Sequence, residues 1–258
     1  MMKVRLIGYT QPVDIIGLDD VQDLIAYCAR VSNPSNQLNQ ETAPKLLNYL
    51  AKHKHWSPFE MASATMEIET TRDIARQMLR HRSFAFQEFS QRYADPAEFG
   101  NQFVYRETRL QDTKNRQNSI EIDKLEHGDI DIKWHDYQRK VIAAAKEAYE
   151  WAVANGIAKE QARCVLPEGN TKSRLYMQGS IRSWIHFIEL RSGNGTQKEH
   201  MEVAREIGAA ITKIFPLAET YINKSNKYDI GSFLRIMQMT TLEVMLKFIT
   251  ISKMNLHF

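Results

Sequence analysis

The hydrophobic pattern of residues 61–82 changes, without a linker, from the period of a strand to that of a helix. From Met61 to Thr70 apolar and polar side chains alternate, which predicts a strand with one buried face. Residues 72–82 follow as a predicted helix that Thr71 would cap and that carries Asp73 in its first turn. The chain must therefore pack a sheet against helices.

The other predicted elements follow in no regular order. Two further strands are predicted, at Val4–Tyr9 and Leu175–Ser180. Apolar spacing predicts helices in five more segments: Leu18–Val31, Ala43–Lys52, Trp134–Asn155, Ser183–Leu190 and Gln197–Phe215. Because strands and helices mix without a regular alternation, the sequence predicts an α+β fold, with a mixed sheet and packed helices, rather than a doubly wound parallel sheet.

One main domain is expected over residues 1–225, with an insertion at about 105–133. The segment Tyr105–Lys133 is charged and has no hydrophobic period, which indicates a mobile excursion. Residues 226–258 are interpreted as a C-terminal extension whose role stays open. Within it, Phe233–Ile251 is apolar but carries three charges, so an amphipathic helix that packs or faces another subunit is favoured over a membrane span.

Composition excludes several classes of protein. Of the 258 residues 43% are hydrophobic and 25% are charged, as in ordinary globular proteins and unlike fibrous or disordered chains. The net charge of +3 is too small to indicate a nucleic-acid polymer or a membrane as partner. Two cysteines, Cys28 and Cys164, cannot build a disulfide framework, and no apolar signal run follows Met1. We therefore expect a reduced, cytoplasmic protein.

Arginines are concentrated between residues 72 and 92. Arg72, Arg76 and Arg80 are spaced four apart and would share one helix face, and three more basic residues follow them: His81, Arg82 and Arg92. Glu88 is the one acid between Asp73 and Asp95. Two interpretations are open: more distant carboxylates, such as Glu67 and Glu69, pair with these arginines, or the arginines bind the phosphate of a ligand.

Aromatic and neutral hydrogen-bonding side chains fill the interval between Arg82 and Arg92, which suits stacking on a base as well as phosphate binding. A nucleotide is therefore the simplest ligand. The chain has no phosphate-binding glycine loop, because Gly193 and Gly195 lack a third glycine and no Walker lysine follows. Any dinucleotide must be held by side chains.

The segment Arg80-His81-Arg82, followed after seven residues by Ser90, resembles the signature of the flavin-dependent thymidylate synthases, the ThyX family. Other parts of the chain are similar to that family as well. They are Ala29–Ser32, the loop His55–Glu60, Arg163–Pro167, Arg182-Ser183 and Leu190-Arg191. The similarity spans about Val4 to Asn223, and Gln87 and Ala85 depart from the residues that many relatives carry there.

This resemblance implies a ThyX-like fold and a homotetramer whose active sites are shared between subunits. It implies reductive methylation of dUMP to dTMP, with methylenetetrahydrofolate as carbon donor and FAD, reduced by NADPH, as hydride source. In similar enzymes no protein cysteine attacks the uracil ring, and Cys28 and Cys164 are interpreted as small core residues.

The resemblance also assigns site residues, by position in the motifs. For dUMP they are Gln77, Arg80, Glu88, Ser90, Arg92, Arg163 and Arg191. For FAD they are Ser32, His55, Ser57, Arg80, His81, Arg82, Glu88, Ser180, Arg182 and His186. Arg80 and Arg92 would hold the phosphate, and Arg191, the expected catalytic residue, would polarise the uracil. His55 would lie where folate and nicotinamide approach the flavin.

Less specific interpretations stay open beside this one. Ser90 is a weak nucleophile candidate because no base is assigned to it, so hydrogen bonding to the nucleotide is preferred. His53, His55 and Glu60 do not have the spacing of a zinc site, and no metal is expected. The rival functions are a nucleotide- or RNA-binding module without redox chemistry, and a thiol- or metal-dependent nucleotide enzyme.

Overall fold

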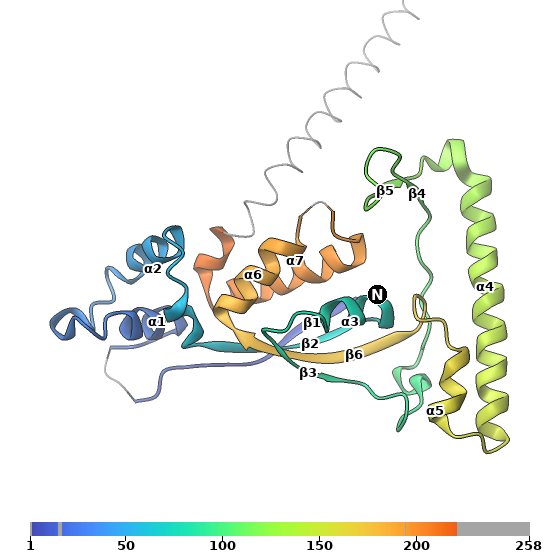
Figure 1. The fold of residues 1–258 in the computed structure, drawn as a ribbon, viewed down its shortest axis with the longest axis horizontal. Helices are drawn as coiled ribbons and strands as arrows, with labels where there is room; N and C mark the ends of the chain where they lie inside the picture. Colours follow the sequence, from blue (N-terminus) through green and yellow to red (C-terminus); the bar gives the residue numbers. More distant parts are fainter. Residues whose placement is uncertain (1, 15–16, 194, 221–258) are drawn as a thin grey trace, which may run out of the picture.

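The computed structural model describes residues 2–14, 17–193 and 195–220. The expected extension 226–258, with its amphipathic helix at Phe233–Ile251, lies outside the described residues. Figure 1 shows an elongated molecule with a long sheet at its centre, the N-terminal helices at one end and a long helix at the other.

Four strands form the central sheet, in the order β1-β2-β6-β3. Their bounds are Lys3–Tyr9 for β1, Ser63–Thr71 for β2, Ala85–Glu88 for β3 and Lys172–Ser180 for β6. The α+β class is confirmed, but every pair of neighbours is antiparallel, so the expectation of a mixed sheet is wrong. Strand β3 is short and was not predicted, because its four residues lie inside the arginine-rich motif.

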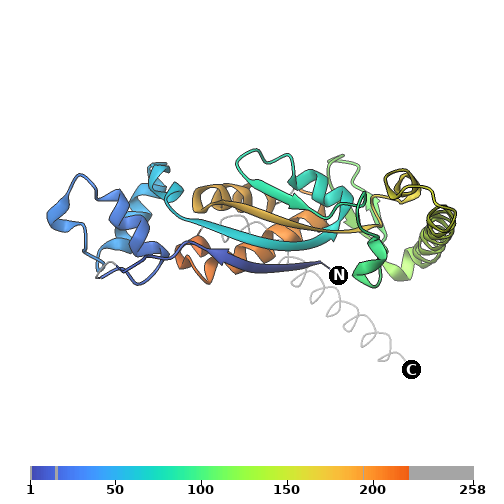
Figure 2. The same ribbon diagram turned by 90° about the horizontal axis from the view of Figure 1, so that it is seen from below.

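Seven α-helices surround this sheet in the described part of the chain. They are α1 (Val21–Ala29), α2 (Ala43–Lys52), α3 (Arg72–Met78), α4 (Lys124–Ala154), α5 (Lys159–Ala162), α6 (Ile181–Arg191) and α7 (Lys198–Thr212). Short 3-10 turns lie at Pro34–Asn36, Ser57–Glu60, Pro96–Phe99, Arg163–Val165 and Pro216–Ala218. Helices α6 and α7 cover one face of the sheet (Figures 1 and 2). No helix in the described ranges is both long and apolar enough to cross a membrane.

Strand β2 confirms the predicted alternation and uses its polar face for pairing. Ala64, Met66 and Ile68 are fully buried in the core. The register places Glu67 opposite Arg5 on β1 and Glu69 opposite Arg174 on β6, and each carboxylate forms an ion pair with its opposite arginine. The suggestion that Glu67 and Glu69 neutralise the motif arginines is therefore wrong.

The helix predicted over residues 72–82 ends early, at Met78. Thr71 occupies the N-cap position, but its hydroxyl bonds the Asp73 carboxylate instead of a helix N–H. Beyond Met78 the chain turns so that Phe84 packs against Trp184, at 4.6 Å between ring centroids, and directly over Gly179 of β6. Burial of this aromatic side chain outweighs the local helical pattern, so Arg80, His81 and Arg82 lie in a loop.

The segment 105–133 contains secondary structure, contrary to the expected mobile excursion. Strands β4 (Arg109–Gln111) and β5 (Ser119–Glu121) form a hairpin, and α4 begins at Lys124, ten residues before the predicted start. Ion pairs attach this segment to the core: Arg106 reaches Asp73 at 2.6 Å and Arg109 reaches Glu199 at 2.5 Å. Since charged contacts hold it, hydrophobic periodicity could not reveal it.

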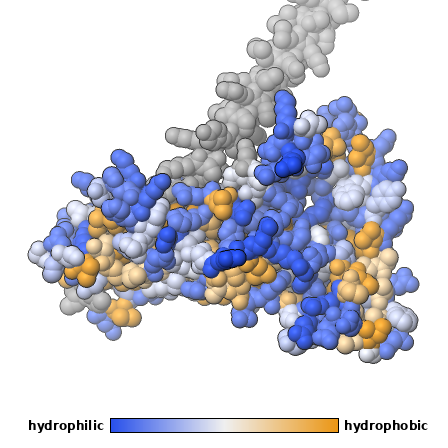
Figure 3. Space-filling view, in the orientation of Figure 1, coloured by the Kyte–Doolittle hydropathy of each residue, from blue (hydrophilic) through white to orange (hydrophobic). Residues whose placement is uncertain are grey.

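Helix α4 stands at the end of the molecule and exposes much apolar side chain. Figure 3 shows apolar surface over the α4 and α5 end, among charged residues. One face of α4 is buried against its own chain, in a small second core with Phe103, Ala162 and Leu166. Another face of α4, which includes Val141 and Trp151, stays exposed.

Candidate functional site

The predicted site residues that make contacts fall into three groups. The Arg191 group comprises Gln77, Arg80, His81 and Arg191. The Arg92 group comprises Ser90, Arg92 and Arg163, with Glu88 beside it. The Arg182 group comprises Ser180, Arg182 and His186, and Ser57 begins the 3-10 turn that carries Glu60, the partner of Arg182. Each group is built by different elements, and each has a different electrostatic environment.

The Arg191 group joins the loop after α3 to the last turn of α6. Nε of Arg191 donates a hydrogen bond to Nε2 of His81 at 3.0 Å, so the imidazole accepts and is neutral, with its proton on Nδ1. Burial, Arg191 and Arg80 all lower the pKa of His81. Burial and Arg80 also lower the pKa of Arg191. The group thus concentrates positive charge in a half-buried place and keeps its histidine uncharged.

No carboxylate within the described residues forms an ion pair with Arg80, Arg82 or Arg191. Arg80 and Arg82 are exposed at the surface. A cation that burial and a like charge disfavour, and that no acid compensates, is suited to bind an anion. This is the observation that most favours the phosphate interpretation of the motif.

His200 on α7 belongs to the Arg191 group and was not singled out from the sequence. Its ring is fully buried, and Nδ1 lies 3.2 Å from Oε1 of Gln77, whose amide donates to Gln197 at 2.7 Å. Burial and the charge of Arg191 lower the pKa of His200 to about 3. Its Nε2 has no hydrogen-bond partner in the described part of the chain. The available signal was a histidine on the apolar face of the predicted helix Gln197–Phe215.

In the Arg92 group, Arg92 is exposed and a carboxylate neutralises its charge. Arg92 contacts the carboxylate of Glu160 on α5 through two nitrogens, at 3.2 and 3.3 Å, and its guanidinium lies 5.6 Å from the Tyr93 ring centre. Nε of Arg163 donates to the Glu160 carbonyl at 3.3 Å. Two other motif arginines also have acids beside them: Arg72 has Glu88 at 3.7 Å, and Arg76 has Glu168 at 2.5 Å. For these arginines the carboxylate interpretation holds.

Glu88 and Ser90 make polar contacts that do not involve a base. Oε1 of Glu88 accepts a hydrogen bond from Ser173 at 2.8 Å. The backbone N–H of Arg92 donates to the Ser90 hydroxyl at 3.4 Å. No histidine or carboxylate activates Ser90 among the described residues, which agrees with a hydrogen-bonding role.

The Arg182 group lies where β6 ends and α6 begins. Arg182 pairs with Glu60 at 2.8 Å, and Ser180 caps α6 by accepting from the backbone of Ser183. Burial opposes ionisation of Glu60, but hydrogen bonds from Ser180 and Arg182 outweigh it and lower its pKa. The His186 ring meets Trp56 edge-on at 4.8 Å, and burial followed by Arg182 lowers its pKa.

Three predicted flavin residues lie apart from these groups. His55 is exposed beside Tyr49 and His53, Ser32 is exposed after α1, and Arg82 is exposed beyond the Arg191 group. Glu60 forms an ion pair with Arg182 rather than a metal site with His53 and His55. No set of three His, Cys, Asp or Glu side chains stands ready for a metal ion in the described ranges.

The two cysteines differ from the expected core residues. Cys28 is half-buried, and burial raises the pKa of its thiol. Cys164 is exposed, so its interpretation as a core residue is wrong. It lies in the 3-10 turn Arg163–Val165 between α5 and β6, where it lines a surface groove together with Val165.

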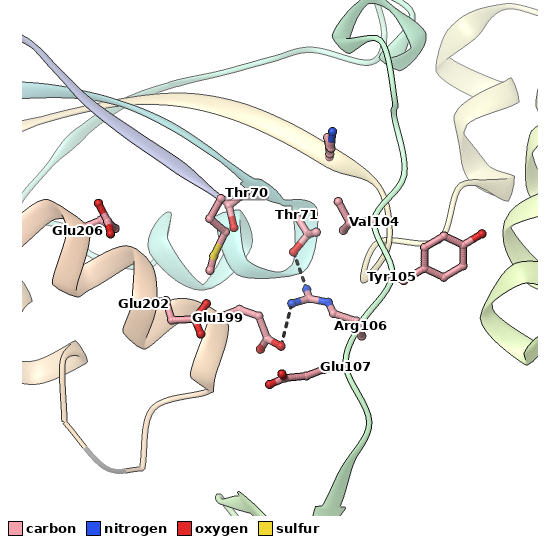
Figure 4. Close-up of a pocket in the computed structure, with 11 residues that line it drawn as sticks. Thr70, Thr71, Val104, Tyr105, Arg106, Glu107, Glu199, Glu202 and Glu206 are labelled. Atoms are coloured by element: carbon pink, nitrogen blue, oxygen red, sulfur yellow. Dashed lines mark hydrogen bonds and ion pairs between the residues drawn. The ribbon is translucent and has the colours of Figure 1, made fainter. Parts of the chain in front are cut away.

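Two cavities lie near this region. One, of about 640 Å³, is lined by Trp56 and His186 and opens between the Arg182 group and α2. The other, of about 450 Å³, lies between α7 and the segment before β4, with Arg106 bonded to Thr71 and Glu199 at its centre (Figure 4). It contains no predicted site residue.

The three groups are spread along β6 and α6. Glu88 contacts Ser173 near the start of β6, whereas Ser180 ends that strand seven residues later, about 23 Å away. Arg182 and Arg191 are separated by nine residues of α6, about 14 Å. Glu88, beside the Arg92 group, and the Arg182 group therefore lie near opposite ends of β6, and Arg182 and Arg191 lie near opposite ends of α6.

Fold and site together describe an α+β protein whose arginine side chains, rather than a glycine loop, are suited to bind an anion. Residues 7–217 match the family model Thy1, described as thymidylate synthase complementing protein. The chain belongs to this family, that of the flavin-dependent thymidylate synthases.

Individual relatives agree with this membership. The chain is 49% identical to a probable flavin-dependent thymidylate synthase of Paramecium bursaria Chlorella virus 1, over 83% of this chain and 96% of the relative. It is 47% identical to the flavin-dependent thymidylate synthase of Synechocystis, with the same coverage. A crystal structure of the UMP/dUMP methylase PolB from Streptomyces cacaoi, bound with 5-Br dUMP, has a similar fold, with a TM-score of 0.71 and 25% identity over 87% of this chain and 95% of that one.

Proposed function

We propose that this protein methylates dUMP reductively to dTMP, with methylenetetrahydrofolate as the carbon donor and NADPH as the reductant. The observation that carries the proposal is the Arg191 group: guanidinium groups without acids, beside a neutral histidine, inside the family's signature. The names of the relatives and the methylase with 5-Br dUMP support it.

Four arginines, a glutamine, a glutamate and a serine would bind dUMP. Arg80 and Arg92 would grip the phosphate, and for Arg92 the phosphate would displace the exposed Glu160. Arg191 would face the uracil and stabilise the negative charge that develops on it, and His81 would fix the guanidinium by accepting from Nε. The remaining positions assigned to dUMP are Gln77, Glu88, Ser90 and Arg163.

The residues present fit FAD, because a dinucleotide bound without a glycine loop needs cations and hydroxyl donors. Arg80 and Arg82 have no acid partner in the described chain. Ser180 and Arg182 lie where β6 ends, His186 lies one turn further along α6, and Ser57 begins the turn whose Glu60 pairs with Arg182. When bound, FAD would supply the hydride. His81 and Glu88 would complete the contacts, with Ser32 and His55 from the N-terminal region of the same or another copy.

A homotetramer with shared active sites accounts for the separation of the three groups. The lengths of β6 and α6 keep them apart in one chain, and a second copy could bring the Arg182 group of one subunit to the Arg92 group of another. The expected cytoplasmic location and the absence of a nucleic-acid polymer or membrane as partner stay predictions.

The test is reconstitution of the reaction from purified protein. We expect a yellow protein with oxidised-flavin absorbance that converts dUMP to dTMP only when methylenetetrahydrofolate and NADPH are both present. A colourless protein that takes up no FAD would favour a nucleotide-binding module instead. The double variant Cys28→Ser/Cys164→Ser should keep the activity, and its loss in a folded double variant would favour a thiol-dependent enzyme.

A further inference from the structure

Helix α4 carries two apolar stripes, of which only one is covered. The buried stripe comprises Gln138, Ile142, Ala145, Tyr149 and Ala152 and packs on the second core. The second stripe comprises Ile130, Trp134, Tyr137, Val141, Ala144, Ala148 and Trp151. It repeats at the alternating spacing of four and three residues that brings side chains to the seam of a coiled coil.

The second stripe, called here the α4 seam, faces solvent in the single chain. Val141 is 52% exposed and Trp151 is 62% exposed, and Trp134 and Tyr137 are also exposed. From Trp134 to Trp151 it is about 26 Å long. Large aromatic side chains repeated along one helix face are costly to leave in water, so this face is suited to a partner.

We propose that the α4 seam joins two copies of this chain, with their α4 helices antiparallel about a two-fold axis that passes between residues 142 and 143. The inference rests on the proposed assembly of several copies and adds which surface joins them. In this register Val141 faces the partner's Ala144, Tyr137 faces the partner's Ala148, and Trp134 faces the partner's Trp151.

Shape supports a second copy as the occupant. A groove of about 530 Å³ runs along the C-terminal half of the seam, where Ala144 and Ala148 leave room beside Trp151, Ile157 and Val165. Antiparallel pairing brings the large Trp134 and Tyr137 of the other copy to this half. Parallel pairing would place the alanines against each other and leave the groove unfilled, which forfeits contacts.

Charge supports the same register. Lys140 and Glu147 flank the seam on one side, and the antiparallel arrangement places Lys140 within two residues of the level of the partner's Glu147, twice by symmetry. Within its own chain Lys140 pairs with the half-buried Asp136 at 2.7 Å and lies 5.5 Å from the Tyr137 ring centre, and Glu147 has no ion pair among the described residues. Like charges do not meet across the seam in this register.

Sedimentation velocity of the full-length protein tests the proposal with a matched pair of substitutions. Ala144→Asp places a carboxylate in the seam, and Ala143→Asp makes the same change one position away on the same exposed helix. We expect Ala144→Asp to at least halve the sedimenting mass and Ala143→Asp to leave it unchanged. Equal masses for Ala144→Asp and the unmodified protein would overturn the proposal.

Charge exchange tests the register. Lys140→Glu or Glu147→Lys alone should weaken the assembly, and the double variant should restore it. If the double variant assembled more weakly than either single variant, the antiparallel register would be overturned.

Cys164 gives a second readout, because it lines the groove. In a Cys28→Ser background, its thiol should react with a disulfide reagent at least ten times more slowly in the unmodified seam than in Ala144→Asp. Equal rates would contradict the proposal.

The outcomes separate this inference from the proposed function. If the protein assembles and forms dTMP, and Ala144→Asp does not change its sedimenting mass, only the α4 seam is refuted. A chain that sediments as one copy at every concentration refutes both the α4 seam and the shared sites.

Discussion

The Arg191 group and the Arg92 group use the same side chain in opposite environments. Arg191 is half-buried, its pKa is lowered by burial and by Arg80, and its neighbour His81 is neutral. Arg92 is exposed and lies against the carboxylate of Glu160. The charge of a half-buried arginine without an acid nearby can be neutralised by a bound anion. An exposed ion pair can instead exchange its acid for a ligand at a small cost in free energy. The first environment suits a catalytic role and the second suits reversible phosphate binding.

The largest effect is expected at the buried arginine. Arg191→Ala should lower the rate of dTMP formation about 100-fold or more, because it removes the charge that stabilises the developing anion. Flavin absorbance should remain, since the Arg182 group is untouched. Arg76→Ala is the matched control, because Arg76 pairs with the exposed Glu168 and should lose little. Comparable losses in both variants would remove the distinction between the two environments.

The loop that carries Arg80 and His81 of the Arg191 group depends on a glycine. A Cβ atom at residue 179 would overlap the Phe84 ring, whereas a Cβ at Gly8 of β1 would meet open space. Gly179→Ala should therefore cost about 1–3 kcal/mol of the free energy of unfolding and weaken dUMP binding, as Phe84 and its loop shift. Gly8→Ala should change neither quantity. Urea unfolding and dUMP titration of both variants measure this, and an unchanged Gly179→Ala would show that the loop is positioned otherwise.

Contacts between residues far apart in the sequence limit what could be predicted from the sequence alone. The alternation of β2 and the bounds of α2 are local patterns, and they were predicted well. The early end of α3 depends on Phe84 meeting Gly179, about a hundred residues away in sequence. The ion pairs of Arg106 and Arg109 that order segment 105–133 are equally long-range. Motif spacing identified site residues, but it could not indicate that they form three separate groups.

His200 tests whether burial keeps a histidine of the Arg191 group neutral. Its pKa of about 3 lies below that of an exposed histidine, so the unfolded chain binds more protons and stability falls as the pH drops through about 6.5. Between pH 7.5 and 5.5 this histidine should account for about 1 kcal/mol of the lost free energy of unfolding.

The measurement is urea unfolding at both pH values, with His200→Gln as the variant. Glutamine keeps a donor for Gln77 and does not titrate, so the variant should lose about 1 kcal/mol less than the unmodified protein. His81 and His186 also have lowered pKa values and should keep a smaller pH dependence in both proteins. If the free energy of unfolding changed equally with pH in both proteins, folding would leave the pKa of His200 unchanged, contrary to its burial.

The smallest effect is expected at the exposed ion pair. Glu160→Gln removes the acid beside Arg92, and because the pair is about half exposed, stability should change by less than about 0.5 kcal/mol. If phosphate replaces Glu160 on Arg92, the same variant should bind dUMP as tightly as the unmodified protein or up to a few-fold more tightly, and Arg92→Gln should bind it less tightly. Fluorescence titration with dUMP at low and moderate salt resolves these changes, and the gain should shrink at higher salt as the charges are screened. Weaker dUMP binding in Glu160→Gln would mean that the carboxylate holds Arg92 in its binding position, and the two arginine environments would then differ in exposure but not in how they are prepared for the ligand.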